Sequence, residues 1–364
     1  MKKFIIPFLG FLIWGISGQS QPHINLALPD AISSGPGVLF NSDTILDITL
    51  KGNIRELIKS RTGEEKYFPI ILTYKNEAGI DESIPISVKT RGHFRRQSSN
   101  CIYPPLLLKF SAKDKNLSSV FPDSSSLKLV MPCRGEEFTV HEWLVYKLYN
   151  LVTPESFRAR LVKVKLEGND NKKMPSPFYG IILESENQMA KRNNDVIIKK
   201  KMEPQETMKE PFLKMATFEY LIGNTDWSVQ YLQNIKLIAE DSNSVPTAVP
   251  YDFDLAGIVN SPYALPAEEL KMSSVRERRY RGFCVQDIKL FDSTVAFYNQ
   301  LKSKIYKIYT GCSLLDEKYI KNTTKFLDEF YATINNPKLL KKEFQYPCDP
   351  NGTGNVIIKG LRED

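Results

Sequence analysis

The sequence lacks the residues on which several common catalytic sites depend. It has three histidines, and His141-Glu142 begins the His-Glu-x-x-His pattern of zinc proteases with Val145 in place of the second histidine. The Gly-Lys dipeptide of a phosphate-binding P-loop is absent. The Gly-x-Ser-x-Gly turn of serine hydrolases and the Cys-x-x-Cys spacing of many zinc and redox sites are absent too. These absences argue against all four kinds of site.

Long apolar runs are also missing after residue 20. Residues 1–20 have a basic start, an apolar run interrupted by Pro7, and small residues before Gln21, which together are typical of a secretory signal peptide. A membrane anchor is the alternative, but the run is short for one. We therefore expect a periplasmic or secreted protein with no membrane span in the mature chain.

The composition is that of a globular protein, with 42% hydrophobic and 25% charged residues. The formal net charge of +7 is a mild excess and gives no reason to expect nucleic acid as a partner. Five cysteines in an exported chain permit disulfides. We expect Cys101 to pair with Cys133 and Cys284 with Cys312, leaving Cys348 unpaired, although sequence alone does not fix the pairing.

Strand patterns dominate the first half of the mature chain. Ile84, Ile86 and Val88 alternate on one face of a predicted strand, and a hairpin turn is expected just before it at residues 76–79. One helix is expected at 141–152. The predicted strands of this half are 45–52, 67–76, 83–92, 104–110, 127–132, 157–168, 178–186 and 195–201.

Helix patterns take over after about residue 205. Helices are expected at 207–224 and over roughly 287–342, with one short strand at 233–238. We predict an α+β fold with two lobes and a cleft between them. The expected division is a strand-rich lobe at 21–203, a helix-rich lobe with the catalytic loop at 204–348, and a tail at 349–364.

Four oxygen-bearing side chains follow one another in the second half. Asp226 comes after the helix pattern, Asn234 opens the short strand, and Asp252 and Asp254 lie in the apolar stretch PYDFDLAG. Carboxylate and amide oxygens suit Mg²⁺ or Mn²⁺ when phosphates and water complete the coordination. The order Asp, Asn, Asp is also that of the kinase catalytic loop and its metal-binding Asp, although the spacing differs. The alternative is that these aspartates cap turns.

The same segments resemble the CotH family of secreted, atypical protein kinase-like proteins. NTDWSVQYLQN and VPYDFDLAG resemble two of the family's site elements. VKTRG at 88–92, PPLLLKF at 104–110 and FYGIILE at 178–184 are similar to its upstream elements, so the resemblance covers about residues 85–262. Tyr251 replaces the usual Trp, and His93-Phe94 follows Arg-Gly where small polar residues are commoner.

The resemblance implies a two-lobed kinase-like fold that uses ATP and a divalent cation. It implies that Asp226 orients or deprotonates the acceptor and that Asp252 binds the metal, with Asn234 and Asp254 as helpers. The acceptor, a protein or a small molecule, is not specified. Two alternatives stay open: a non-catalytic exported binding protein with the same fold, and a metal-dependent phosphohydrolase.

The cation that holds the nucleotide phosphates has three candidates. Lys109 and Lys128 lie inside predicted strands, and Arg91 follows another. Glu142 on the first-half helix is the expected carboxylate partner, with Glu184 second. Taken alone, each of these residues is better explained as an ordinary surface charge than as a ligand.

Two basic runs are expected to be solvated faces. They are KKK at 199–201 and RERRYR at 276–281. The alternative for the second run is that it binds phosphate or an acidic acceptor.

Overall fold

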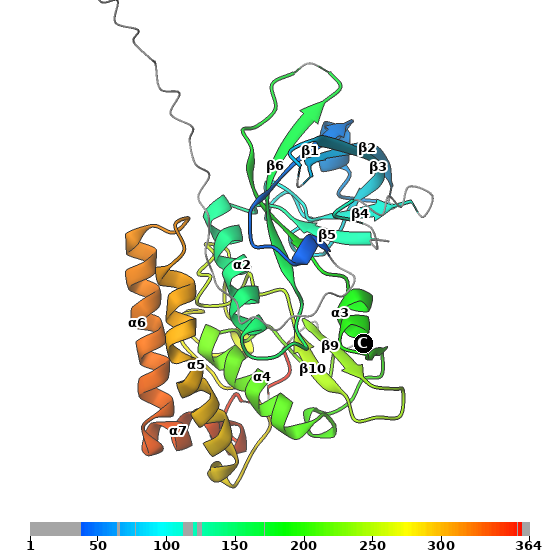
Figure 1. Ribbon diagram of the computed structural model, residues 1–364. Helices are drawn as coiled ribbons and strands as arrows, with labels where there is room; N and C mark the ends of the chain where they lie inside the picture. Colours follow the sequence, from blue (N-terminus) through cyan, green and yellow to red (C-terminus); the bar gives the residue numbers. More distant parts are fainter. Residues whose placement is uncertain are drawn as a thin grey trace, which may run out of the picture.

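The computed structural model describes residues 38–63, 66–76, 78–111, 119–121, 126–170, 172–354 and 356–358. Over these residues the fold is α+β, with strands in the first part of the chain and mainly helices in the second (Figure 1). The expected signal peptide lies outside the described residues. No helix in the described ranges is long and apolar enough to cross a bilayer.

The strands of the first part form a closed barrel in the order β1-β2-β3-β4-β5-β7-β6. Neighbouring strands are antiparallel except β1 and β6, whose parallel pairing closes the barrel. The strands are β1 (Leu46–Gly52), β2 (Phe68–Lys75), β3 (Asp81–Thr90), β4 (Leu106–Phe110), β5 (Ser126–Val130), β6 (Ala159–Gly168) and β7 (Phe178–Leu183). Strand patterns predicted the strands but not their closure into a barrel.

The barrel interior is filled by alternate residues of each strand. In β3, Ile86 and Val88 are buried and Ile84 is half-buried, in agreement with the predicted face. The expected turn joins β2 to β3, where the Asn76 side chain accepts hydrogen bonds from the backbone N–H groups of Ala78 and Ile80. The short helix α1 (Ile54–Lys59) buries Ile54 and Leu57 in the same core.

The second part contains helices and a small antiparallel sheet. The sheet order is β10-β9-β8, and β8 precedes residue 203, so a segment grouped with the first lobe by sequence pairs within the second part. Its strands are β8 (Val196–Ile198), β9 (Ile235–Ala239) and β10 (Thr247–Pro250). Its helices are α2 (Glu136–Asn150), α3 (Glu186–Arg192), α4 (Lys209–Ile222), α5 (Asp292–Thr310), α6 (Glu317–Ile334) and α7 (Pro337–Phe344).

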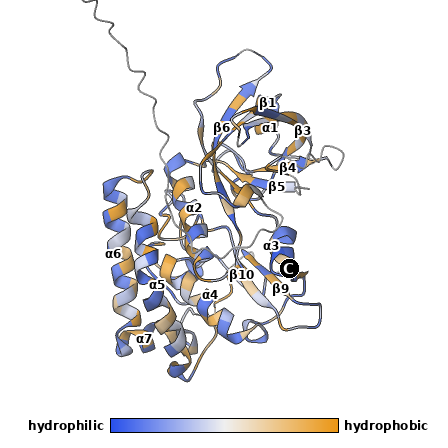
Figure 2. Ribbon diagram, viewed as in Figure 1, coloured by the Kyte–Doolittle hydropathy of each residue, from blue (hydrophilic) through white to orange (hydrophobic). Residues whose placement is uncertain are grey.

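A second hydrophobic core joins these helices and is separate from the barrel core. In α6 the buried residues Phe326, Leu327, Phe330, Tyr331 and Ile334 recur every three or four positions. Figure 2 shows hydrophilic and hydrophobic residues mixed along α6, as expected for a helix with one buried face.

Helix α2 connects the barrel to the second core. It lies between β5 and β6 in the chain, and its central residues are buried, including Trp143, whose Nε1 donates to the Ala159 carbonyl of β6 at 3.2 Å. Because α2 packs on the barrel strands and on α5, it holds Glu142 and Tyr146 at the boundary between the two parts.

The disulfides confirm one predicted pair and correct the other. Cys101 bonds to Cys133 as expected. Cys284 bonds to Cys348, 64 residues away, and Cys312 is a buried free thiol. The prediction of Cys284 with Cys312 was wrong because α6 and α7 lead the chain back to Cys284 only at the 3-10 turn Tyr346–Cys348.

Candidate functional site

Asp226 lies in a loop that begins where α4 ends. Gly223 terminates the helix in the left-handed conformation, with φ of 68°. A Cβ at this position would meet Phe326 Cζ at 3.0 Å and the Val275 carbonyl oxygen at 3.2 Å, so glycine is required by both conformation and space. Asn224 Oδ1 then accepts a hydrogen bond from the Asp226 N–H at 3.1 Å, which fixes the start of the loop.

Asp226 and Asn234, predicted as members of one site, are in direct contact. Asn234 Nδ2 donates to Asp226 Oδ2 at 2.9 Å and to the Asp226 carbonyl oxygen at 2.8 Å. Burial raises the pKa of Asp226, and the negative charge of Asp252 raises it further, while hydrogen bonds from Gln233 and Asn234 lower it. Asp252 is therefore close enough for its charge to act on Asp226.

Asp252 is held by both α2 and the small sheet. The Tyr251 N–H donates to the Asn234 carbonyl at 3.0 Å, which places Asp252 just beyond the β9–β10 pairing. The Asp252 N–H donates to the Tyr146 hydroxyl of α2 at 3.0 Å. Asp252 and Asn234 both have positive φ, 66° and 51°, a backbone conformation that is uncommon outside glycine and is found more often at functional sites.

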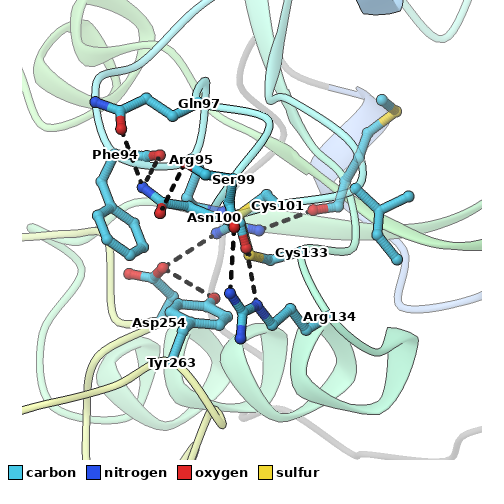
Figure 3. The surroundings of a disulfide bond; sticks show 12 residues. Phe94, Arg95, Gln97, Ser99, Asn100, Cys101, Cys133, Arg134, Asp254 and Tyr263 are labelled. Carbon is cyan, nitrogen blue, oxygen red and sulfur yellow. Dashed lines mark hydrogen bonds and ion pairs between the residues drawn. A yellow bond between two sulfur atoms is a disulfide. The ribbon is translucent and has the colours of Figure 1, made fainter.

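A buried arginine, Arg95, joins the two remaining predicted carboxylates. Its Nη1 lies 3.3 Å from Glu142 Oε2 and 3.5 Å from Asp254 Oδ2, and its Nη2 donates to the Met131 carbonyl at 2.8 Å. In Figure 3, Arg95 and Tyr263 both reach Asp254, and the Tyr263 hydroxyl donates to Asp254 Oδ2 at 3.0 Å. The Cys101–Cys133 disulfide lies beside this network.

Charge and burial oppose each other in the Arg95 network. Burial raises the pKa of Glu142 to about 8, although the charge of Arg95 acts to lower it. Burial and then the charge of Asp252 raise the pKa of Asp254 to about 7. For Arg95, burial acts to lower the pKa, but Tyr263, Asp254 and Glu142 raise it overall, so the guanidinium stays charged.

Lys128 and Arg91 lie near Asp252. Lys128 Nζ is 4.7 Å from the centre of the Tyr251 ring. Burial and then the charge of Arg91 lower the pKa of Lys128 to about 8, while Asp252 acts to raise it. Lys236 Nζ lies 5.7 Å from the centre of the same ring and pairs with Glu186 at 2.8 Å. Positive charge thus gathers around Tyr251, one residue before Asp252.

The other predicted residues have different surroundings. Lys109 is exposed, with its Nζ 5.5 Å from the centre of the Tyr67 ring, and lines a groove of about 800 Å³ on the barrel together with Lys51. Glu184 pairs with Arg192 at 3.0 Å and accepts the Arg158 N–H at 2.9 Å. These contacts involve neither Asp226 nor Asp252.

The two basic runs behave differently. Residues 199–201 are exposed, as expected. The expectation of a solvated face at 276–281 was wrong: Arg278 donates to the carbonyls of Leu221 and Phe326 and its guanidinium lies 3.5 Å from the centre of the Phe326 ring, while Tyr280 is fully buried. Apart from Tyr280 the run is half-buried, because its arginines donate to backbone carbonyls of α4, of α6 and of nearby loops.

Asp252 and Asn234 are the residues of this site that could bind a divalent cation. In the parts of the chain that the structure describes, no group of three His, Cys, Asp or Glu side chains is placed to hold a metal ion by itself. Asp252, with the amide of Asn234, offers one carboxylate and one further oxygen, which is the number of protein ligands that Mg²⁺ commonly takes in phosphoryl-transfer sites. The charge of Asp252 acts to raise the pKa of both Asp226 and Asp254, which marks negative charge that a cation would relieve.

Two residues of this site escaped the sequence analysis. Arg95 stands in RGHFRR, where three arginines in six residues were the available signal. Tyr146 lies within the helix expected at 141–152, and the helix pattern does not single out its hydroxyl. Neither a protein-family model nor a curated protein sequence matches this chain.

Proposed function

We propose that this protein transfers a phosphoryl group from ATP, with Mg²⁺ or Mn²⁺, to a hydroxyl acceptor. The observation that carries the proposal is the Asp226–Asn234 hydrogen bond of 2.9 Å, with Asp252 near enough to raise the pKa of Asp226. In phosphoryl transfer the protein chiefly positions the reactants and neutralises charge, and an Asp, an Asn and a second Asp suffice for this.

The order of elements supports a two-lobed, kinase-like arrangement of the CotH type. Lys128 on β5 is followed by Glu142 on α2, then by two antiparallel strands, β6 and β7. The helix α4 then leads to Asp226, and the β9–β10 hairpin leads to Asp252. A protein kinase has the same sequence of strand lysine, helix glutamate, catalytic loop and metal-binding Asp.

Each residue of the site has a role in this proposal. Lys128 and Arg91 neutralise the phosphates, and Asp252 with Asn234 holds the cation. The cation would supply positive charge against the phosphates. The acceptor oxygen forms the new bond to the γ-phosphorus, the β–γ bridging oxygen leaves with ADP, and the acceptor proton passes to Asp226.

In this site the helix glutamate has a different positively charged partner from that of a kinase. In protein kinases the strand lysine pairs with the helix glutamate. Here Arg95 pairs with Glu142 at 3.3 Å and with Asp254 at 3.5 Å, so these two carboxylates already have a positively charged side chain as their partner. Lys128 is then available for the nucleotide, which supports its assignment over Lys109.

The test is transfer from labelled ATP with Mn²⁺ by the mature protein and three variants. We expect phosphate incorporation by the wild-type protein and by Asp241→Asn, which alters an exposed turn carboxylate after β9, and none by Asp226→Asn or Asp252→Asn. Release of free phosphate without incorporation would instead indicate a phosphohydrolase. No turnover by the wild-type protein would indicate a non-catalytic binding protein.

A further inference from the structure

A pocket of about 290 Å³ is lined by Trp227, the residue after Asp226, and by Arg281, whose charge acts on Asp226. One wall consists of residues 227–231, which follow Asp226, and a second consists of residues 281–284. The third is the C-terminal segment, with Gly354 and residues 356–358. The volume suits one amino-acid side chain or one sugar ring.

Arg281 connects the Asp226 loop to that C-terminal segment. Its Nη1 donates to the Thr225 carbonyl, one residue before Asp226, at 3.4 Å. Its Nη2 donates to the Val356 carbonyl at 3.1 Å. A planar guanidinium can hold two carbonyls in one fixed geometry, which a lysine ammonium cannot reproduce.

The C-terminal segment is itself fastened to the same stretch of chain. Cys284, three residues after Arg281, bonds to Cys348. Arg279 Nη1 donates to the Tyr346 hydroxyl at 3.0 Å and also to Thr353 Oγ1. The disulfide and Arg279 therefore fix the segment on both sides of residue 349, before it reaches Val356.

We propose that the phosphate acceptor binds in this pocket, and that Arg281 positions the Asp226 loop by tying it to the disulfide-anchored C-terminal segment. The inference rests on the proposed function, because it takes Asp226 as the group that receives the acceptor proton. The acceptor is a compound or side chain that presents one hydroxyl next to Asp226. Ser228 and Gln230 line the pocket and supply polar groups for the rest of it.

The anchoring is tested by amide hydrogen exchange, which needs no catalytic activity. In the double variant Cys284→Ser/Cys348→Ser we expect exchange to rise roughly fivefold or more in residues 346–358 and also in residues 224–231. The matched control is Cys101→Ser/Cys133→Ser, in which the rise should stay near residues 95–101. A rise confined to residues 346–358 would overturn the inference, because the segment would then not support the Asp226 loop.

The role of Arg281 is tested by the same exchange measurement, with Arg278 as the control residue. Arg281→Gln should raise exchange in residues 224–231, and Arg281→Lys should restore part of the protection. Arg278→Gln removes contacts to Leu221 and Phe326 instead, and its effect should appear near those residues. Equal effects of Arg278→Gln and Arg281→Gln on residues 224–231 would overturn the role of Arg281.

A kinetic measurement distinguishes positioning from general damage. With ATP and Mn²⁺ as substrates, Arg281→Gln should lower kcat about tenfold or more and leave the KM for ATP unchanged, because the nucleotide contacts are made by other residues. An increase in the KM for ATP with unchanged kcat would overturn the inference. If the wild-type protein turns over no ATP, the proposed function fails, and the exchange experiment still decides whether the segment supports the loop.

Discussion

The guanidinium of Arg95 lies between two buried carboxylates, 3.3 Å from Glu142 and 3.5 Å from Asp254. Arg95 Nε and Glu142 Oε1 are buried without a hydrogen-bond partner among the described residues. The three groups are therefore mutually dependent: the arginine is held in the interior by the carboxylates, and they are tolerated there because of the arginine.

Removing Arg95 should destabilise the fold strongly. We expect Arg95→Met to lower the free energy of unfolding by about 3 kcal/mol, because two carboxyl groups lose their buried counter-charge. The matched control is Arg55→Met, which breaks an exposed pair with Asp170 at 3.1 Å and should cost less than about 1 kcal/mol. Urea unfolding of both variants measures the difference, and equal losses would contradict the buried network.

Stability should fall as the pH rises from about 5 to about 8. The pKa of Glu142 is raised by burial from 4.5 to about 8, so in this window the unfolded chain has lost a proton that the folded chain keeps. An acid with a raised pKa makes the free energy of unfolding decrease with pH, by at most about 1.4 kcal/mol per pH unit. Urea unfolding across this range should give the negative slope, and Glu142→Gln should reduce it. An unchanged slope in that variant would exclude Glu142 as its source.

Substitution of Lys128 and substitution of Lys109 should have different effects on nucleotide binding. With ATP and Mn²⁺ at about 100 times the dissociation constant, binding should add about 2.7 kcal/mol to the wild-type stability, seen as a higher Tm. Lys128→Met should abolish most of this increase and Lys109→Met should keep it, because Lys128 lies near Asp252 and Lys109 lies against Tyr67. The reverse result would return the phosphate-binding role to Lys109.

The affinity for ATP should weaken in alkaline solution. Burial and the charge of Arg91 lower the pKa of Lys128 to about 8, so the ammonium that we propose as the phosphate contact is lost as the pH rises through that value. Isothermal titration between pH 7 and pH 9 should show the decrease, and Lys128→Arg should remove it because arginine stays protonated. A decrease of the same size in Lys128→Arg would point to another group.

Gly223 should be more sensitive to alanine than other glycines with positive φ. Gly223→Ala introduces an unfavourable left-handed residue and a Cβ 3.0 Å from Phe326 Cζ. Gly79 has φ of 76° but no atom within 4 Å of its Cβ position, so Gly79→Ala carries the conformational cost alone, about 1 kcal/mol. Thermal unfolding should show a clearly larger loss for Gly223→Ala, and equal losses would mean that the close packing relaxes at no cost.

Sequence patterns predicted what depends on local order and missed what depends on distant partners. Strand patterns located β1 to β7, and the order of the polar residues after α4 placed Asp226 and Asn234 in one predicted site. The Arg95 network joins segments from three separate parts of the chain, so no local pattern contains it. The local pattern predicts a solvated face at 276–281 for the same reason, because the carbonyls to which these arginines donate lie far away in sequence.

The parallel pairing of β1 with β6 has a consequence for how the chain matures. Residues 46–52 pair with residues 162–168 only after the intervening strands and α2 have been synthesised. One edge of the nascent sheet therefore stays unpaired while more than a hundred residues are added. Backbone groups on such an edge can pair with another chain. Self-association should therefore be greatest in fragments that end before β6 and should disappear only when both β6 and β7 are present, because β7 pairs with β5 and with β6.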